Sequence, residues 1–68
     1  MVNIQRLKGE VKANGLTTTE MARKMGVSPD TLNQLYAGRR QFKLNHVNNI
    51  CEILNLSKTQ RDAIFFAD

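Results

Sequence analysis

The sequence predicts an all-α fold, a compact bundle of five helices in one domain over residues 1–68. Apolar residues recur at spacings of three and four, and a glycine follows each of the first three segments with this spacing. No segment alternates apolar and polar residues for long enough to form a strand. With 68 residues, 41% of them hydrophobic, the chain is near the lower size limit for a domain that folds unaided.

The first helix is expected over about residues 4–14, where three apolar residues share one face: Ile4, Leu7 and Val11. Gly15 follows, in the position where a left-handed residue commonly ends a helix. Thr17 and Glu20, three residues later, match the capping box, in which each side chain accepts a hydrogen bond from the other residue's backbone amide. A second helix therefore begins at Thr18, and its inner stripe consists of Met21, Ala22 and Met25.

Ser28 before Pro29 predicts the start of the third helix, because serine caps well and proline at the first helical position loses no needed hydrogen bond. This helix is expected to reach about Ala37, before Gly38.

A basic connection, "RRQFKL", leads to the fourth helix, for which we expect Asn45 as the cap and an inner stripe of Val47, Ile50, Cys51 and Leu54. Ser57 with Gln60 repeats the capping-box pattern and opens a short fifth helix that contains Ile64 and Phe65.

The third helix has two different sides on a helical wheel. Leu32, Leu35 and Tyr36 group on one side, and the other carries Asp30, Asn33, Gln34 and Ala37. Asparagine and glutamine amides match the N6 and N7 edge of adenine, a carboxylate can accept from cytosine N4, and the Thr31 methyl could touch a thymine methyl. The alternative is that Asp30 complements the helix dipole and that both amides are neutral surface choices.

The second and third helices are separated only by "GVS", and the small Ala22 lies four residues before Gly26, where two helices must cross closely. This layout, over about residues 18–37, is that of a helix-turn-helix. The stretches "TEMARKMGVSPDTLNQLYAGRR", "ICEILNLS" and "RDAIFF" resemble the DNA-binding domain of lambdoid phage repressors and their small Cro-type counterparts. The resemblance covers nearly the whole chain.

The resemblance implies base reading by the start of the third helix, through Pro29, Asp30, Thr31, Asn33 and Gln34. It implies phosphate contacts by Thr17, Thr18, Ser28, Arg39, Arg40 and Lys43. Tyr36 could add a phosphate contact through its hydroxyl, or it could be wholly structural, and the two arginines could instead cap free helix carbonyls. Several phage repressors have glutamine at the first two positions of this helix, where this chain has Pro29 and Asp30, so we expect a different operator sequence.

The charge distribution favours a polyanion as the partner. Up to Lys43 there are eight basic residues against three acidic ones, whereas from Leu44 onward two basic residues face three acidic ones. The alternative is a basic surface kept for solubility, which would account equally well for charges spread evenly along the chain. The uneven distribution favours the polyanion.

The residues predict neither a catalytic site nor a metal site, so we expect no enzyme, no cofactor and no small-molecule ligand. His46 has no ligand-type residue at metal spacing and is expected on the surface, while Cys51 is expected to pack as a small apolar group. The longest apolar runs are too short to span a membrane and the N-terminus lacks a secretory signal, so we expect a cytoplasmic protein.

The sequence therefore predicts a transcriptional regulator, a phage or mobile-element repressor of Cro type that binds a double-stranded operator. Two copies should bind an inverted repeat with half-sites about 34 Å apart, as a weak homodimer that DNA strengthens. Ile53 and Phe66 are the candidate dimer contact, unless Phe66 folds back over the first helix. The alternative function is a protein-binding module on the same scaffold, such as an antirepressor or antitoxin.

Overall fold

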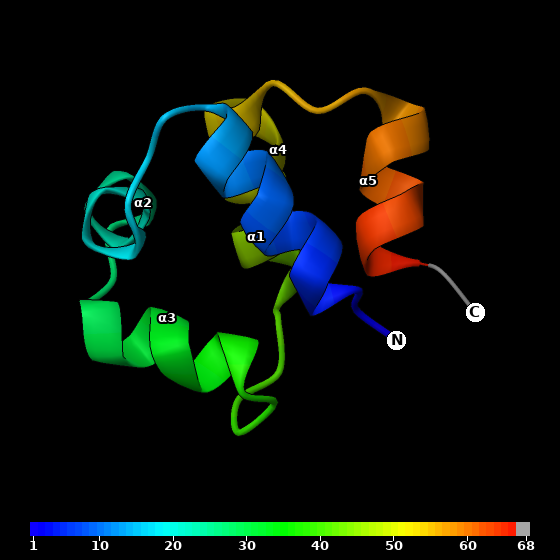
Figure 1. Cartoon of the computed structure of the whole chain (residues 1–68). Helices are drawn as coiled ribbons and strands as arrows, with labels where there is room; N and C mark the ends of the chain where they lie inside the picture. The colour runs from blue at the N-terminus through cyan, green and yellow to red at the C-terminus, as the bar shows by residue number, and fades with distance from the viewer. Residues whose placement is uncertain (67–68) are drawn as a thin grey trace.

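The computed structural model describes residues 1–66 and contains five α-helices in that part of the chain, without a strand (Figure 1). They are α1 (Ile4–Ala13), α2 (Thr18–Met25), α3 (Pro29–Tyr36), α4 (Leu44–Leu54) and α5 (Lys58–Phe65). The prediction of an all-α, five-helix fold is confirmed.

The helices surround one core, from which α3 projects at the lower edge of Figure 1. Helix α2 packs against α3 and α4, and α1 packs against α5. The N-terminus is tied to the last helix, because the Asn3 backbone N–H donates to the Ile64 carbonyl oxygen at 2.7 Å. The basic connection is anchored by Phe42, whose ring meets that of Phe65 edge-on at 5.6 Å between centroids.

Each helix contributes at least one fully buried side chain to this core: Leu7, Met21, Ala22, Leu32, Leu35, Ile50 and Ile64. Burying a leucine or isoleucine side chain contributes about 1.5–3 kcal/mol. A chain of this size has little stability to spare, so these apolar contacts hold α3 in place even though a helix of 8 residues would not persist alone.

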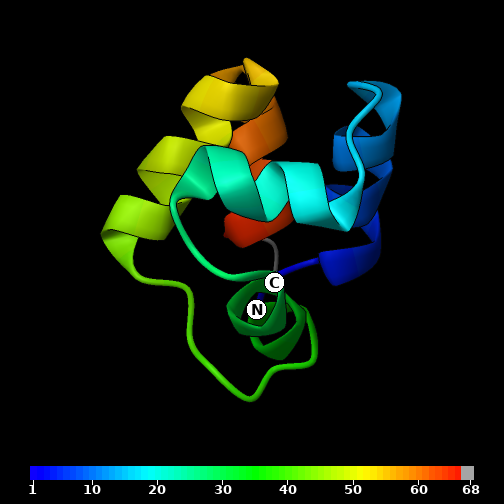
Figure 2. The same ribbon diagram turned by 90° about the vertical axis from the view of Figure 1, so that its left-hand side faces the viewer.

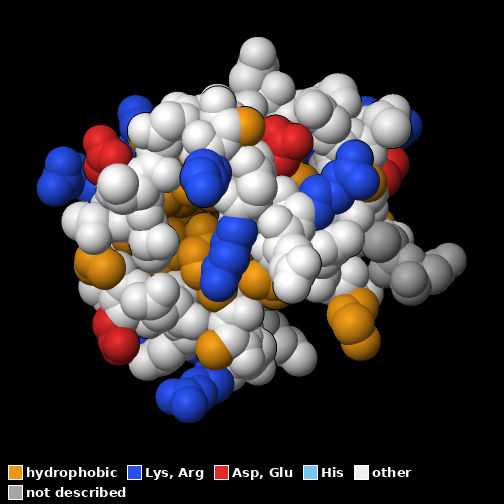
Figure 3. All heavy atoms as spheres, viewed as in Figure 1, with side chains coloured by type: hydrophobic (Ala, Val, Ile, Leu, Met, Phe, Trp, Pro, Cys, Tyr) orange, Lys and Arg blue, Asp and Glu red, His pale blue; other side chains and the backbone are white. Residues whose placement is uncertain are grey.

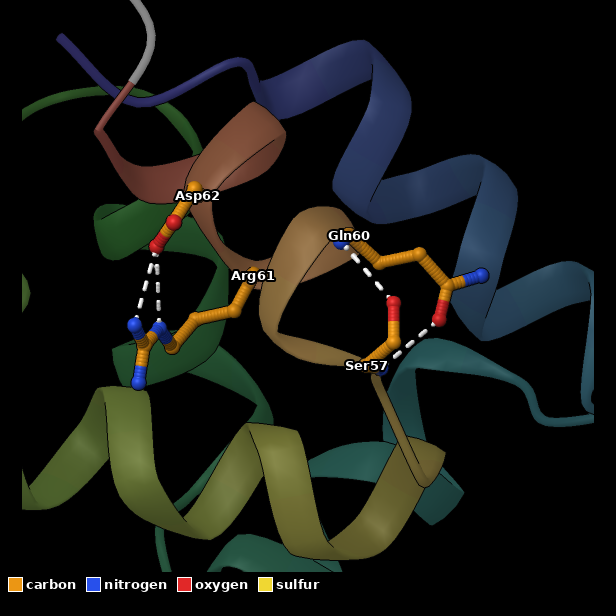
Figure 4. A network of polar contacts seen from close by, with 4 residues as sticks. All are labelled: Ser57, Gln60, Arg61 and Asp62. Carbon is orange, nitrogen blue, oxygen red and sulfur yellow. Dashed lines mark hydrogen bonds and ion pairs between the residues drawn. The ribbon is translucent and has the colours of Figure 1, made fainter.

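Side chains cap the ends of the helices as the sequence predicts in two places. At the start of α2, the Thr17 backbone N–H donates to Glu20 Oε1 at 2.9 Å, and the Glu20 backbone N–H donates to Thr17 Oγ1 at 3.1 Å. Ser57 and Gln60 make the same reciprocal pair at the start of α5, at 2.8 and 3.1 Å (Figure 4). Both capping boxes are confirmed.

Two approximate helix ends differ from the structure by one residue, and the predicted cap of α4 is wrong. Helix α1 ends at Ala13 and α3 at Tyr36, one residue earlier than expected in each case. Asn45 is not the cap of α4, because the helix already begins at Leu44 with Lys43 as its N-cap residue. The Lys43 backbone N–H donates to His46 Nδ1 at 3.1 Å, so His46 supports this end of α4 and is half-buried instead of simply lying on the surface.

Candidate nucleic-acid interface

The turn between α2 and α3 has the geometry that a close helix crossing requires. Gly26 has φ 75°, a left-handed conformation that glycine adopts without a Cβ penalty. The Val27 backbone N–H donates to the Ala22 carbonyl oxygen at 3.0 Å, which closes the end of α2. Ala22 is fully buried. A larger side chain at this position would push the two helices apart.

The two sides of α3 meet different surroundings, as the helical wheel predicts. Leu32 and Leu35 are 0% and 1% exposed, and they fasten the helix to the core. Asp30 and Asn33 are exposed on the other side, together with Ala37 and the half-exposed Gln34. We call Asp30, Asn33 and Gln34 the polar face of α3. With Ala37 and Arg39 they line a shallow hollow of about 250 Å³.

The first turn of α3 is held by its cap. The Thr31 backbone N–H donates to Ser28 Oγ at 3.1 Å, and the Ser28 hydroxyl donates to Thr31 Oγ1 at 2.9 Å. Ser28, which the resemblance places at a phosphate, is therefore already engaged within the protein. Pro29 stands at the first helical position and is exposed.

A hydrogen-bonded chain links the polar face to the loop that follows. Gln34 Nε2 donates to Asp30 Oδ2 at 3.0 Å, one turn earlier in α3. The Arg40 Nε–H donates to Gln34 Oε1 at 2.6 Å. Residue spacing alone did not indicate this contact, because it depends on the chain folding back after α3.

The free carbonyl at the end of α3 is satisfied by backbone groups, not by the arginine side chains. The Arg39 and Arg40 backbone N–H groups donate to the Gln34 carbonyl oxygen at 2.9 and 3.3 Å. The alternative, in which the two arginine side chains cap free helix carbonyls, does not hold at the Gln34 carbonyl. The Arg39 side chain is exposed and makes no side-chain hydrogen bond or ion pair among residues 1–66.

On one side of α3, the start of α2 faces α1 across a hollow of about 270 Å³ lined by Lys8, Val11, Lys12, Leu16, Thr17, Thr18 and Tyr36. The Lys8 ammonium lies over the Tyr36 ring, 5.1 Å from its centroid. Tyr36 is half-buried, and the loss of solvent raises the pKa of its phenol. Its hydroxyl is a hydrogen-bond donor at neutral pH with or without this shift. Figure 3 shows Lys and Arg side chains on this face above hydrophobic ones.

Lys8 and Lys12 were missed as candidates. Their spacing of four residues puts them on one side of α1, which the sequence does show, but nothing local indicates that this side meets Thr17, Thr18 and Tyr36.

On the other side of α3, a hollow of about 770 Å³ separates the helix from the start of α4. Its lining includes Thr31, Arg40, Lys43 and His46, and Leu44 at its edge is 72% exposed. Figure 2 shows α3 end-on at the bottom of the molecule, with the start of α2 on one side and the start of α4 on the other. Candidate phosphate contacts therefore lie on both sides of the candidate base-reading helix.

The two candidate dimer residues differ in exposure. Phe66 is 58% exposed, so it is not buried over α1, whereas Ile53 is half-buried against the core. The Arg61 guanidinium lies 5.7 Å from the Phe66 ring centroid and pairs with Asp62 at 3.0 Å (Figure 4). The exposed ring is thus bordered by an ion pair.

The remaining features of the described part of the chain concern metal binding, the Cys51 thiol and membrane spanning. Residues 1–66 contain no group of three or more His, Cys, Asp or Glu residues arranged to hold a metal ion. Cys51 is half-buried, and burial raises the pKa of its thiol while the Arg61 charge acts in the opposite direction. Within residues 1–66, none of the helices has the length and apolar character needed to cross a bilayer.

Comparison with known proteins agrees with this geometry. The family model described as "Helix-turn-helix domain" matches residues 5–64, which include all of α2, the turn and α3. No curated protein and no solved structure gave a significant match. The chain belongs to the helix-turn-helix domain family, which indicates a DNA-binding regulator.

Proposed function

We propose that this protein is a sequence-specific transcriptional regulator, a repressor of the Cro type from a phage or mobile element, which reads an operator through the major groove. One observation carries the proposal: α3 is fastened by Leu32 and Leu35 while Asp30 and Asn33 stay exposed on its opposite side. Short polar side chains weaken an isolated helix, so a helix built this way is better suited to hydrogen bonding with a partner than to holding itself together.

In this proposal α3 enters the major groove, which is about 12 Å wide and accepts one helix. Asn33 and Gln34 read adenine edges, Asp30 accepts from a cytosine amine, and Thr31 and Pro29 make apolar contacts near the start of the helix. Each bidentate amide contact contributes about 1–3 kcal/mol of discrimination against a wrong base. Asp30 also disfavours duplexes that offer no donor to its carboxylate, because an unpaired negative charge near phosphates is repelled.

The phosphates are held from both sides of the groove. In this proposal Thr17, Thr18 and Tyr36 contact one strand, joined by Lys8 and Lys12, which line the same hollow. Lys43, beside the start of α4, and Arg39, at the end of α3, contact the other strand. Ser28 and Arg40 are each bonded to a neighbouring side chain, so we assign them a smaller share of the phosphate contacts. Such contacts set position and orientation and make affinity depend on salt.

Two copies bind an inverted repeat in this proposal, with their α3 helices about 34 Å apart. Self-association in solution is weak, because the exposed apolar contact available to it among the described residues is small, with Phe66 as its centre and Ile53 mostly packed inward. DNA strengthens the pair by placing both copies side by side. Sedimentation without DNA at nanomolar concentration should show monomers, and a tight dimer there would contradict this part.

Selection of binding sites from random duplexes tests the proposal. We expect an enriched inverted repeat that wild-type protein prefers over scrambled DNA by about 10³-fold or more at physiological salt. If no duplex is enriched, and substitutions at Phe66 rather than at Asn33 abolish regulation in cells, the protein is instead a module that captures another protein.

A further inference from the structure

The Arg40 side chain is hydrogen-bonded to a residue of α3, although Arg40 lies in the loop beyond that helix. Gly38 has φ 79°, and this turn brings the Arg40 backbone N–H to within 3.3 Å of the Gln34 carbonyl oxygen. From this position the Arg40 side chain runs back along α3 and meets the end of the Gln34 side chain at 2.6 Å. The guanidinium is thus bound to a candidate base-reading residue within the protein itself.

The Gln34 carboxamide is held from both ends. An arginine guanidinium can only donate hydrogen bonds, and a carboxylate at neutral pH can only accept them. Arg40 therefore requires the amide oxygen at one end, and Asp30 requires the amide nitrogen at the other. The reversed amide would place like partners against each other at both contacts, so the two charged neighbours select one orientation.

The hydrogen bonds leave Gln34 with unused capacity. A carboxamide has two N–H groups and two oxygen lone pairs, and the contacts with Asp30 and Arg40 use one of each. One donor and one acceptor remain, which is the complement of adenine N7 and N6–H. We propose that Asp30 and Arg40 are positioning residues that hold the Gln34 carboxamide in the one orientation that reads an adenine in the operator. This inference rests on the proposed function.

Fixing the amide in advance has an energetic consequence. A free glutamine side chain must lose rotamer freedom and choose between two amide orientations when it binds a base, and this ordering opposes binding. Here the ordering is already present in the protein alone. Arg39 supplies the matched comparison, because it carries the same charge one residue earlier, is exposed, and makes no side-chain hydrogen bond among residues 1–66.

The test is a double-mutant cycle read as base discrimination. The operator position that Gln34 contacts is the one whose preference is lost in Gln34→Ala. At that position, Arg40→Met and Asp30→Ala should each lower the preference for adenine on the order of tenfold. Neither substitution should lower it further in the Gln34→Ala background. Arg39→Met should weaken binding to the operator and to scrambled DNA by the same factor, and leave the preference unchanged.

A second measurement needs no DNA. In the free protein, the two side-chain amide proton signals of Gln34 should shift in Arg40→Met and in Asp30→Ala, and should stay in place in Arg39→Met. Melting temperatures should remain close to that of the wild type, which excludes a general loss of structure.

Additive effects in the cycle, or Gln34 amide signals that ignore Arg40, would overturn the inference even if the protein selects an operator. If the wild type prefers no duplex at all, the proposed function fails and the reading role fails with it, while the amide signals still show separately whether the three side chains are joined.

Discussion

Replacing Asn33 with alanine should separate DNA reading from folding more cleanly than other changes on the polar face of α3. Asn33 is exposed, and its side chain makes no hydrogen bond among residues 1–66, so its removal leaves neither a cavity nor an unpaired polar group. Alanine has the higher helix propensity by roughly 0.6 kcal/mol. The free energy of unfolding should therefore stay equal or rise slightly.

On DNA the same change should remove one bidentate amide contact, worth about 1–3 kcal/mol, which corresponds to a loss of about 5- to 150-fold on the operator. Binding to scrambled duplexes should stay within about twofold, because no phosphate contact changes. Fluorescence anisotropy on both duplexes at two salt concentrations, together with thermal melting, measures all three quantities. An equal loss on operator and scrambled DNA would refute the reasoning, as would an unchanged operator affinity.

The remaining predictions concern the core, the salt dependence and the pH dependence. Leu35→Ala should lower the free energy of unfolding by about 2–5 kcal/mol in urea titrations, because the side chain is 1% exposed. Affinity falls as salt rises, and Lys12→Met should make the plot of log affinity against log salt less steep by about 0.9. Lys58→Met, at the start of α5, should leave the slope unchanged. Hydrogen bonds from the Thr17 backbone and side chain lower the pKa of Glu20, so its carboxylate stabilises the fold above its ordinary pKa of 4.5, and this stability is lost as pH falls through the lowered value. Glu20→Gln keeps the capping geometry without titrating, so thermal melts of wild type and variant should converge in acid, and a constant difference would contradict the assignment.

The fold could be predicted because its signals are local. Thr17 with Glu20, Ser28 with Pro29, and Ser57 with Gln60 mark three helix starts within four residues each, and all three are present. The start of α4 was misplaced because Lys43 cannot accept a hydrogen bond, and the acceptor that serves its amide is the imidazole of His46. A histidine in that role has no established sequence signature comparable to the Ser or Thr capping box.

The candidate site could be predicted only in part, since half of it depends on contacts between elements. The wheel of α3 already separates Asp30 and Asn33 from the buried leucines. In contrast, the contact of Arg40 with Gln34 needs the left-handed turn at Gly38, and the approach of Lys8 to Tyr36 needs α1 to pack beside α3. The pattern of a single helix cannot indicate which basic side chain from another part of the chain will contact it.

The contacts that hold α3 in the fold are separate from the side chains proposed to read bases. The buried leucines and the Ser28 cap provide the main contacts that fasten this short helix to the fold, and none of them lies on the polar face. Asp30, Asn33 and Gln34 contribute little to the core, so substitutions there can change the preferred operator at small cost in stability. A change that breaks the link to Arg40 should act on base preference at a distance, because that link joins the orientation of Gln34 to the loop beyond the helix. Specificity in this protein should therefore depend on residues outside α3 as well as on the residues that touch the bases.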